Sequence, residues 1–297
     1  MNYRKVICFS LPVAFALLLL SLTGCGSRRD VPVSGPVRTK TVQGEASSLT
    51  VENIFLKTGS STGGPQVELL SDGGAKRAEI EAQESLLDVI VVKFSGSSLR
   101  IVAAQDSCYL VSEPVKIRLY NCDFGKMSFA GACQVTAKAA LGSPEKELGI
   151  TMSGASSLNA EKIEALKLTA DFSGASTAVV REMRLDRFKL DVSGASSFSC
   201  ENCTVAAKCD WNLSGASTLK LAGTGNDLFA VVNGASRVES FDFEQQTCII
   251  TVSGASTMEL NMVKSLGGSI LRGSTVTYQG DPETATEIGS TGKLVKK

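Results

Sequence analysis

The chain of 297 residues is long enough to bury a sizeable core, and its 30 basic and 30 acidic residues cancel to a net charge of zero. This balance gives no reason to expect nucleic acid as a partner. The sequence has no histidine, so the commonest general base and the commonest transition-metal ligand are both missing. Composition therefore disfavours catalysis without excluding it, and we expect no cofactor.

Residues 1–24 have the three parts of a secretory signal peptide. Arg4 and Lys5 are followed by an apolar stretch from Pro12 to Leu20 and then by Leu-Thr-Gly before Cys25. The apolar stretch is shorter than the roughly 20 residues that a membrane-spanning helix needs. We therefore expect this segment to be cleaved.

The Leu-Thr-Gly-Cys sequence resembles the lipobox of bacterial lipoproteins, in which the cysteine thiol carries diacylglycerol. The resemblance implies that Cys25 is lipidated and anchors the protein to a membrane. Several acyl chains would hold it firmly, because each buried methylene contributes about 0.8 kcal/mol. The alternative is an ordinary signal peptide with an incidental cysteine. Residues 25–46 contain Pro32, Pro36 and little apolar periodicity, and we interpret them as the lipidated cysteine followed by a flexible tether.

A short phrase, Ser-Gly-Ala-Ser or a variant of it, recurs through residues 131–290. From Gly131 to Gly273 the successive glycines are 23, 20, 20, 21, 19, 20 and 19 residues apart. A fixed period of this size is typical of a solenoid. Helical repeats of about 33 or more residues do not fit this period, and the leucine and asparagine spacing of leucine-rich repeats is absent.

Each repeat alternates apolar and polar residues on both sides of the glycine. Leu148, Ile150 and Met152 stand six, four and two places before Gly154, and the positions four and six after each glycine are again mostly apolar. Alternation with period two predicts strands with one buried face. We expect the glycine to allow a tight corner with positive φ, and the alanine after it to point inward.

Stacked turns of this kind place equivalent residues above one another at the strand spacing of about 4.8 Å. The sequence therefore predicts an all-β fold over residues 47–297, a right-handed parallel β-helix, or β-solenoid, with about 20 residues per turn.

The Ser-Gly-Ala-Ser phrases, together with the ending Gly-Ser-Thr-Val-Thr-Tyr-Gln-Gly-Asp-Pro at residues 273–282, resemble the autotransporter-adhesin head domain family, also called the GIN domain family. Residues 131–290 carry most of this resemblance, and residues 78–117 match less closely. The resemblance implies a β-helical, adhesin-like module of a lipoprotein. It supplies no catalytic residues.

The cysteines allow two interpretations. Cys200, Cys203 and Cys209 stand close together in the sequence, and thiolates can fill a tetrahedral zinc site. However, the repeat register gives Cys200, Cys209 and Cys248 interior positions, where they would act as small apolar side chains. We therefore predict buried packing residues and no metal.

The predicted function is non-enzymatic binding of a glycan or protein partner by a lipid-anchored protein of the cell envelope, at the outer membrane. Long parallel faces suit extended ligands. Lys167, Arg187 and Lys208 occupy nearly equivalent positions before their glycines and are the candidate ligand-binding residues.

The alternative is a β-helical polysaccharide lyase or glycosidase, which would use paired carboxylates. Asp171 and Asp191 share the position three before the glycine and would lie one above the other. We favour a solvated strand face for both, and we assign no catalytic residue.

Overall fold

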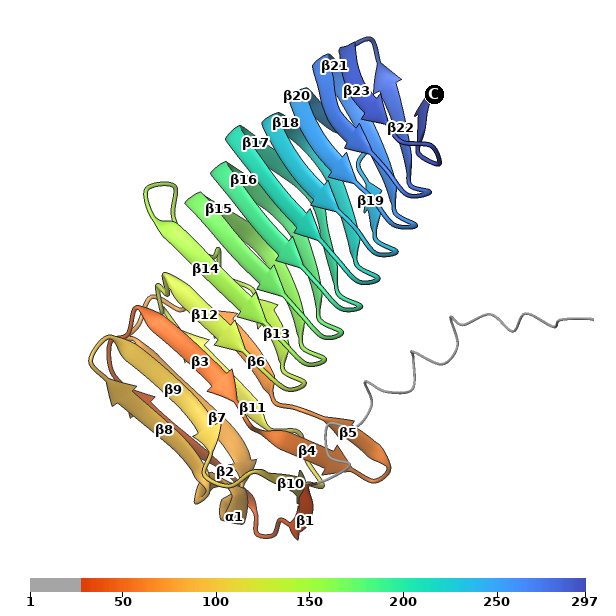
Figure 1. Cartoon of the computed structure of the whole chain (residues 1–297). Helices are drawn as coiled ribbons and strands as arrows, with labels where there is room; N and C mark the ends of the chain where they lie inside the picture. The colour runs from red at the N-terminus through yellow and green to blue at the C-terminus, as the bar shows by residue number, and fades with distance from the viewer. Residues whose placement is uncertain (1–27) are drawn as a thin grey trace, which may run out of the picture.

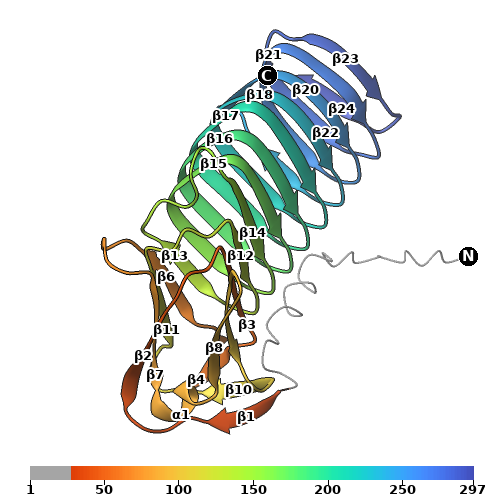
Figure 2. The same cartoon turned by 90° about the vertical axis from the view of Figure 1, so that its left-hand side faces the viewer.

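The computed structural model describes residues 28–297, which form a parallel β-solenoid of about nine turns with roughly 20 residues per turn. Figure 1 shows the turns stacked along one axis, from the red and orange N-terminal strands to the blue C-terminal strands. Figure 2 shows the same stack after a quarter turn. The all-β, solenoidal fold class predicted from the repeat is confirmed.

The regular part of the stack follows the predicted repeat. Its eight strands are β14 (Glu147–Met152), β15 (Ser157–Phe172), β16 (Thr177–Val192), β17 (Ser197–Leu213), β18 (Thr218–Val232), β19 (Arg237–Glu239), β20 (Phe243–Val252) and β21 (Thr257–Ile270).

The long strands each bend and contribute to two sheets. In β15, residues 167–172 pair with β14, whereas residues 157–160 pair with β13. We call the sheet built from segments that precede a Gly-Ala-Ser corner, such as 167–172 and 187–192, the first sheet. The sheet built from segments that follow a corner, such as 157–160 and 177–180, is the second sheet.

The space between the two sheets is filled by columns of apolar side chains, one from each turn. One column has every member at most 1% exposed, and each full burial of a large apolar side chain contributes about 1.5–3 kcal/mol. Its members, in stacking order, are Leu168, Phe188, Cys209, Leu228, Cys248 and Leu266. The apolar residues of the predicted alternation are therefore the ones that form the core.

Each corner depends on a glycine with positive φ. Gly194 has φ 73° and Gly215 has φ 77°, a region that is unfavourable for side chains with a Cβ. A Cβ built on Gly194 would lie closer than 3.0 Å to the carbonyl oxygen of Gly174 in the turn below. That same carbonyl accepts a hydrogen bond of 2.7 Å from the backbone N–H of Ala195. The corners thus require glycine for its φ and for close stacking.

The expectation that the corner alanine points inward is wrong, because the serine after it does. Ala155 is exposed, whereas Ser156 is 1% exposed. The Ser156 hydroxyl donates to the carbonyl oxygen of Ser153 at 3.0 Å, and Ser176 repeats the bond to Ser173 at 2.8 Å. A buried hydroxyl is tolerated here because it closes the corner with its own hydrogen bond.

Strands before the regular repeats extend both sheets out of chain order. They are β3 (Ser48–Glu52), β6 (Gln66–Leu70), β9 (Ser98–Ala103), β11 (Lys116–Tyr120), β12 (Lys126–Phe129) and β13 (Gln134–Ala137). In the first sheet the spatial order is β9, β3, β12, β14. In the second sheet it is β11, β6, β13, β15. The N-terminal turns are therefore interleaved.

Antiparallel strands and a short helix cap the N-terminal end. The cap comprises β2 (Val37–Gln43), β7 (Arg77–Gln83), α1 (Glu84–Leu87) and β8 (Ile90–Ser95), beside a small sheet of β1 (Arg29–Pro32), β4 (Phe55–Thr58), β5 (Ser61–Gly63) and β10 (Ser107–Leu110). The helix buries Leu86 and Leu87 against the end of the core. At the other end, β23 (Glu283–Ile288) continues the first sheet, and β22 (Thr275–Gly280) and β24 (Lys293–Lys296) continue the second.

The cap corrects the interpretation of residues 25–46 as a flexible tether. From residue 28 onward this segment is ordered: β1 pairs with β10, and β2 pairs along its whole length with β7. Backbone hydrogen bonds to neighbouring strands do not require apolar periodicity, so the sequence pattern missed these edge strands. Residues 1–27, including Cys25 and the signal peptide, lie outside the described residues.

We expect Gly194→Val and Gly215→Val to lower the free energy of unfolding by at least the roughly 1–3 kcal/mol of a strained backbone, measured by denaturant unfolding. The matched control is Gly273→Val. Gly273 has the same positive φ of 78°, but its Cβ would lie 3.7 Å from the nearest oxygen. Gly273→Val should lose only the stability that depends on the positive φ, because its side chain meets no close atom in the neighbouring turn. Equal losses in all three variants would therefore refute close stacking as a cause.

Candidate functional site

The outer face of the first sheet carries the predicted basic row. Lys167 pairs in register with Arg187, and Arg187 with Lys208. Their equivalence holds although Lys208 is 21 residues after Arg187, because a register shift between Val205 and Lys208 of β17, opposite Leu185 and Arg187, takes up the extra residue. The structure thus brings the three residues together in one column. Whether they bind a ligand stays a prediction.

Carboxylates lie close to this row. Arg187 Nε is 3.4 Å from Asp186 Oδ2, and Lys208 Nζ is 2.8 Å from Asp210 Oδ1. The side chains of these pairs are about half exposed, and ion pairs at such surface positions contribute at most about 1 kcal/mol each. The row is therefore a mixed-charge surface. Breaking these weak ion pairs to form contacts with a ligand would cost little free energy.

The carboxylates considered for catalysis also lie in one column. Asp171 pairs in register with Asp191, and Asp191 with Asn212, whose amide donates to Asp191 Oδ1 at 3.1 Å. Partial burial, together with the neighbouring Asp191, raises the pKa of Asp171. The two carboxylates stand on an outward strand face, and neither lines the groove described below. This arrangement favours a solvated face, as expected from the sequence.

The same face becomes apolar toward the C-terminal end. Phe229 and Ile249 are neighbours in register and are 42% and 53% exposed, and Val231 lies beside them at 44%. The Lys208 ammonium lies 4.6 Å from the centre of the Phe229 ring. The basic row and this apolar group therefore form one continuous surface.

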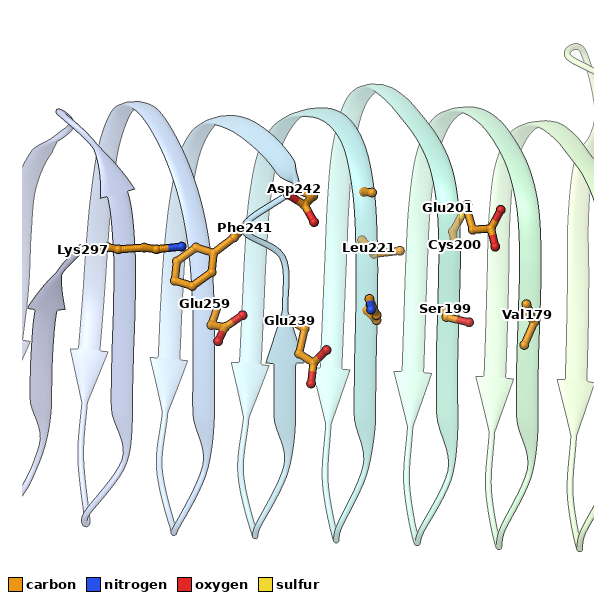
Figure 3. A pocket seen from close by; sticks show the side chains of 12 residues that line it. Val179, Ser199, Cys200, Glu201, Leu221, Glu239, Phe241, Asp242, Glu259 and Lys297 are labelled. Atoms are coloured by element: carbon orange, nitrogen blue, oxygen red, sulfur yellow. The ribbon is translucent and has the colours of Figure 1, made fainter.

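The second sheet carries a groove that sequence reasoning missed. It has a volume of about 600 Å³ and runs across consecutive turns (Figure 3). Its floor includes Val179, Ser199, Lys220 and Glu239, which pair in register from β16 to β19, with Glu259 one turn further along. Four strand spacings of about 4.8 Å make this floor about 19 Å long. The groove therefore runs along the solenoid axis.

One wall of the groove exists because a turn is interrupted. β19 ends at Glu239, and residues 240–242 form a turn that brings Phe241 and Asp242 to the groove. The amide of Gln279 donates to the Phe241 carbonyl at 2.9 Å, and the Lys297 ammonium lies 4.1 Å from the centre of the Phe241 ring. The only sequence signal was the break in alternation at residues 240–243.

The groove combines an aromatic ring with charged groups of both signs. Its acidic residues outnumber its lysines, Lys220 and Lys297. The acidic residues are Glu201, Glu239, Asp242 and Glu259. Glu239 Oε1 forms an ion pair with Arg237 Nε at 2.7 Å. An aromatic face with hydrogen-bond acceptors on both sides suits an extended polar ligand that also has apolar surface.

The cysteines lie where the repeat register predicted. Cys200, Cys209 and Cys248 are 3%, 0% and 1% exposed, so their prediction as buried side chains is confirmed. Burial raises the pKa of the Cys209 and Cys248 thiols. Within residues 28–297 no three Cys, Asp or Glu side chains are grouped as a metal site requires. Metal content itself stays a prediction for measurement.

The described helix is too short to span a membrane. The fold and the groove define a β-solenoid with an extended outer surface. The chain belongs to the family described as "Putative auto-transporter adhesin, head GIN domain", whose pattern matches residues 60–210 and 179–282. No curated protein matches the chain.

Solved structures share the fold at low sequence identity. A putative adhesin from Parabacteroides distasonis has a TM-score of 0.66 at 12% identity, covering 90% of this chain and 100% of its own. A putative adhesin from Parabacteroides merdae has a TM-score of 0.59 at 12% identity, covering 91% and 99%. A putative lipid binding protein from P. distasonis has a TM-score of 0.51 at 14% identity, covering 91% and 100%.

The raised pKa of Asp171 has a measurable consequence. The folded state holds this proton more tightly than the unfolded chain, so its contribution to stability is present below the ordinary aspartate pKa of about 3.9 and is lost as the pH rises through the raised value. We expect Asp171→Asn to raise the melting temperature at pH 7 but not at pH 3. An NMR carboxyl titration of Asp171 should move toward the ordinary value in Asp191→Asn. An ordinary pKa for Asp171 that does not change in Asp191→Asn would contradict this account.

Proposed function

We propose that this protein is a non-enzymatic, adhesin-like lipoprotein of the cell envelope, at the outer membrane, whose solenoid binds a glycan or an envelope protein along its outer surface. The observation that carries the proposal is the groove, which draws one floor residue from each of several consecutive turns. Membership of the adhesin head family supports the adhesin-like part.

Binding along the stack suits a polymer rather than a small molecule. Neighbouring turns present contacts about 4.8 Å apart, so a ligand lying along the axis meets several of them at once. The backbone of every turn is already fixed by its neighbours, so little ordering cost is added for each contact. Weak contacts can therefore add up to useful affinity.

The groove is the primary contact in this proposal, and the basic row of Lys167, Arg187 and Lys208 on the first sheet is a second one. The groove offers enclosure and an aromatic ring, Phe241, while the row offers cations on an open face. Charge contacts on an open face are screened by salt, whereas aromatic packing is not. Salt dependence therefore separates the two contributions.

Binding should be measured with a glycan array and a pull-down from envelope extract. We expect Phe241→Ala to weaken binding at all salt concentrations, by about tenfold for a loss of 1.4 kcal/mol. Val91→Ala is the control, because Val91 is an exposed apolar residue of β8 in the N-terminal cap, away from both the groove and the basic row. Unchanged binding in Phe241→Ala would remove the groove from the proposal.

Replacement of Lys167 and Arg187 together by glutamine should weaken binding mainly at low salt, because counter-ions already screen these charges at high salt. Lys93→Gln with Lys264→Gln makes the same charge change at exposed positions elsewhere. Equal losses of affinity in both double variants would show that net charge, and not the position of the row, determines binding. Turnover of a polysaccharide by the purified protein would replace the proposal with the enzyme alternative.

The lipid anchor is tested at Cys25. Cys25→Ala should abolish labelling by a clickable fatty acid and release the protein from the membrane fraction, since the thiol is the proposed site of acylation. Cys122→Ala, which removes another free thiol, is the control and should keep both properties. Equal labelling of the Cys25 variant would defeat the assignment.

A further inference from the structure

Cys200 and Cys203 occupy one interior corner of the solenoid. In a regular strand, residues three apart point to opposite faces. Here the chain bends at Glu201 and Asn202, which are both exposed, and the thiols before and after the bend both point into the core. Cys200 is 3% exposed and Cys203 is 0% exposed. The bend therefore places both thiols of this strand on the core side.

The neighbouring turn shows what this corner normally holds. Cys200 pairs in register with Val180, and Cys203 with Met183, two buried apolar residues. On the other side, the ladder between β17 and β18 shifts register between Cys200 and Cys203. The corner is thus held in regular register by one neighbour and at a shifted register by the other, where Gly223 packs closely on the backbone of Cys203.

The two thiols already interact and differ in character. Hydrogen bonding from the Cys203 thiol lowers the pKa of Cys200, against the opposing effect of burial. The same bond, with burial, raises the pKa of Cys203. Cys200 is also one of the residues that line the groove on the second sheet (Figure 3), and at 3% against 0% exposure it is the more accessible of the two. Cys209, on the same strand, is fully buried and does not line the groove.

We infer that Cys200 and Cys203 form a reversible dithiol–disulfide pair that an external disulfide oxidises by way of Cys200. The Cys200 sulfur, as its thiolate, attacks one sulfur of the external disulfide and releases the first thiol, leaving a mixed disulfide on Cys200. The Cys203 sulfur then attacks the Cys200 sulfur and releases the second thiol. Two electrons and two protons pass to the external disulfide, which is reduced to two thiols.

This assignment does not depend on the proposed binding function, because it uses only the geometry of the corner. Disulfides persist in oxidising compartments such as the periplasm and the cell surface. An intramolecular bond between residues 200 and 203 would cross-link the chain at the edge of the groove without joining different turns. The disulfide would therefore modify this one corner and would not cross-link neighbouring turns of the solenoid.

The test uses the reduced full chain in detergent, treated with oxidised glutathione, alkylated and digested with trypsin. Residues 190–208 form one tryptic peptide that contains Cys200 and Cys203 alone, and residues 209–220 form the next, with Cys209 as a buried control. We expect the first peptide to lose both alkylation sites and gain an internal disulfide, which a reductant reverses. The Cys209 peptide should remain alkylated after unfolding. Two alkylated cysteines in the first peptide after oxidation would overturn the inference.

Two variants test the order of attack. Cys203→Ser should accumulate glutathione on Cys200, whereas Cys200→Ser should leave Cys203 unmodified in the folded protein. Glutathione on Cys203 in the second variant would overturn the role of Cys200. If either variant fails to fold, as judged by its melting curve, the peptide measurement on the unaltered chain still decides whether the pair oxidises.

Discussion

At each regular corner the glycine of one turn lies in close contact with the glycine of the corner below. The carbonyl of Gly174 accepts the hydrogen bond from Ala195, and Gly194 lies so close above this carbonyl that a side chain would displace it. At each corner, the glycine carbonyl therefore accepts a hydrogen bond from the next turn, and the alanine N–H donates one to the previous turn. The distance between turns is fixed there, and the register of both sheets follows from it.

This constraint explains which parts of the fold the sequence reveals. Because every corner needs glycine, the glycines mark the register. Counting back from them placed Lys167, Arg187 and Lys208 in one column despite the extra residue in β17 before Lys208. The buried columns were predictable for the same reason. The inward serine was not, since a hydroxyl beside an alanine looks like the exposed member of the pair until its hydrogen bond to the carbonyl three residues earlier is seen.

The rest depends on contacts that have no period in the sequence. The interleaving of β3 and β6 with later strands joins residues far apart in the chain, and a local pattern cannot encode such pairings. β2 is mostly exposed and is held by backbone hydrogen bonds to β7, so its composition resembled a linker. The groove arises where residues 240–242 interrupt the repeat, and irregular turns are the places where a repeat-based prediction has no information.

The solenoid separates stability from recognition. Inward positions must remain apolar and of fitting volume, because each contacts equivalent residues in the turns above and below. Outward positions carry no such requirement, so the same scaffold can present Lys167 and Arg187 on one face and Glu239 and Phe241 on the other without changing its core. Since the backbone of each turn is fixed by its neighbours, a change in one outward residue alters one contact with a partner and leaves the spacing of the others intact. Specificity in such a protein is therefore set by the order of side chains along a column, which is a property of several turns together.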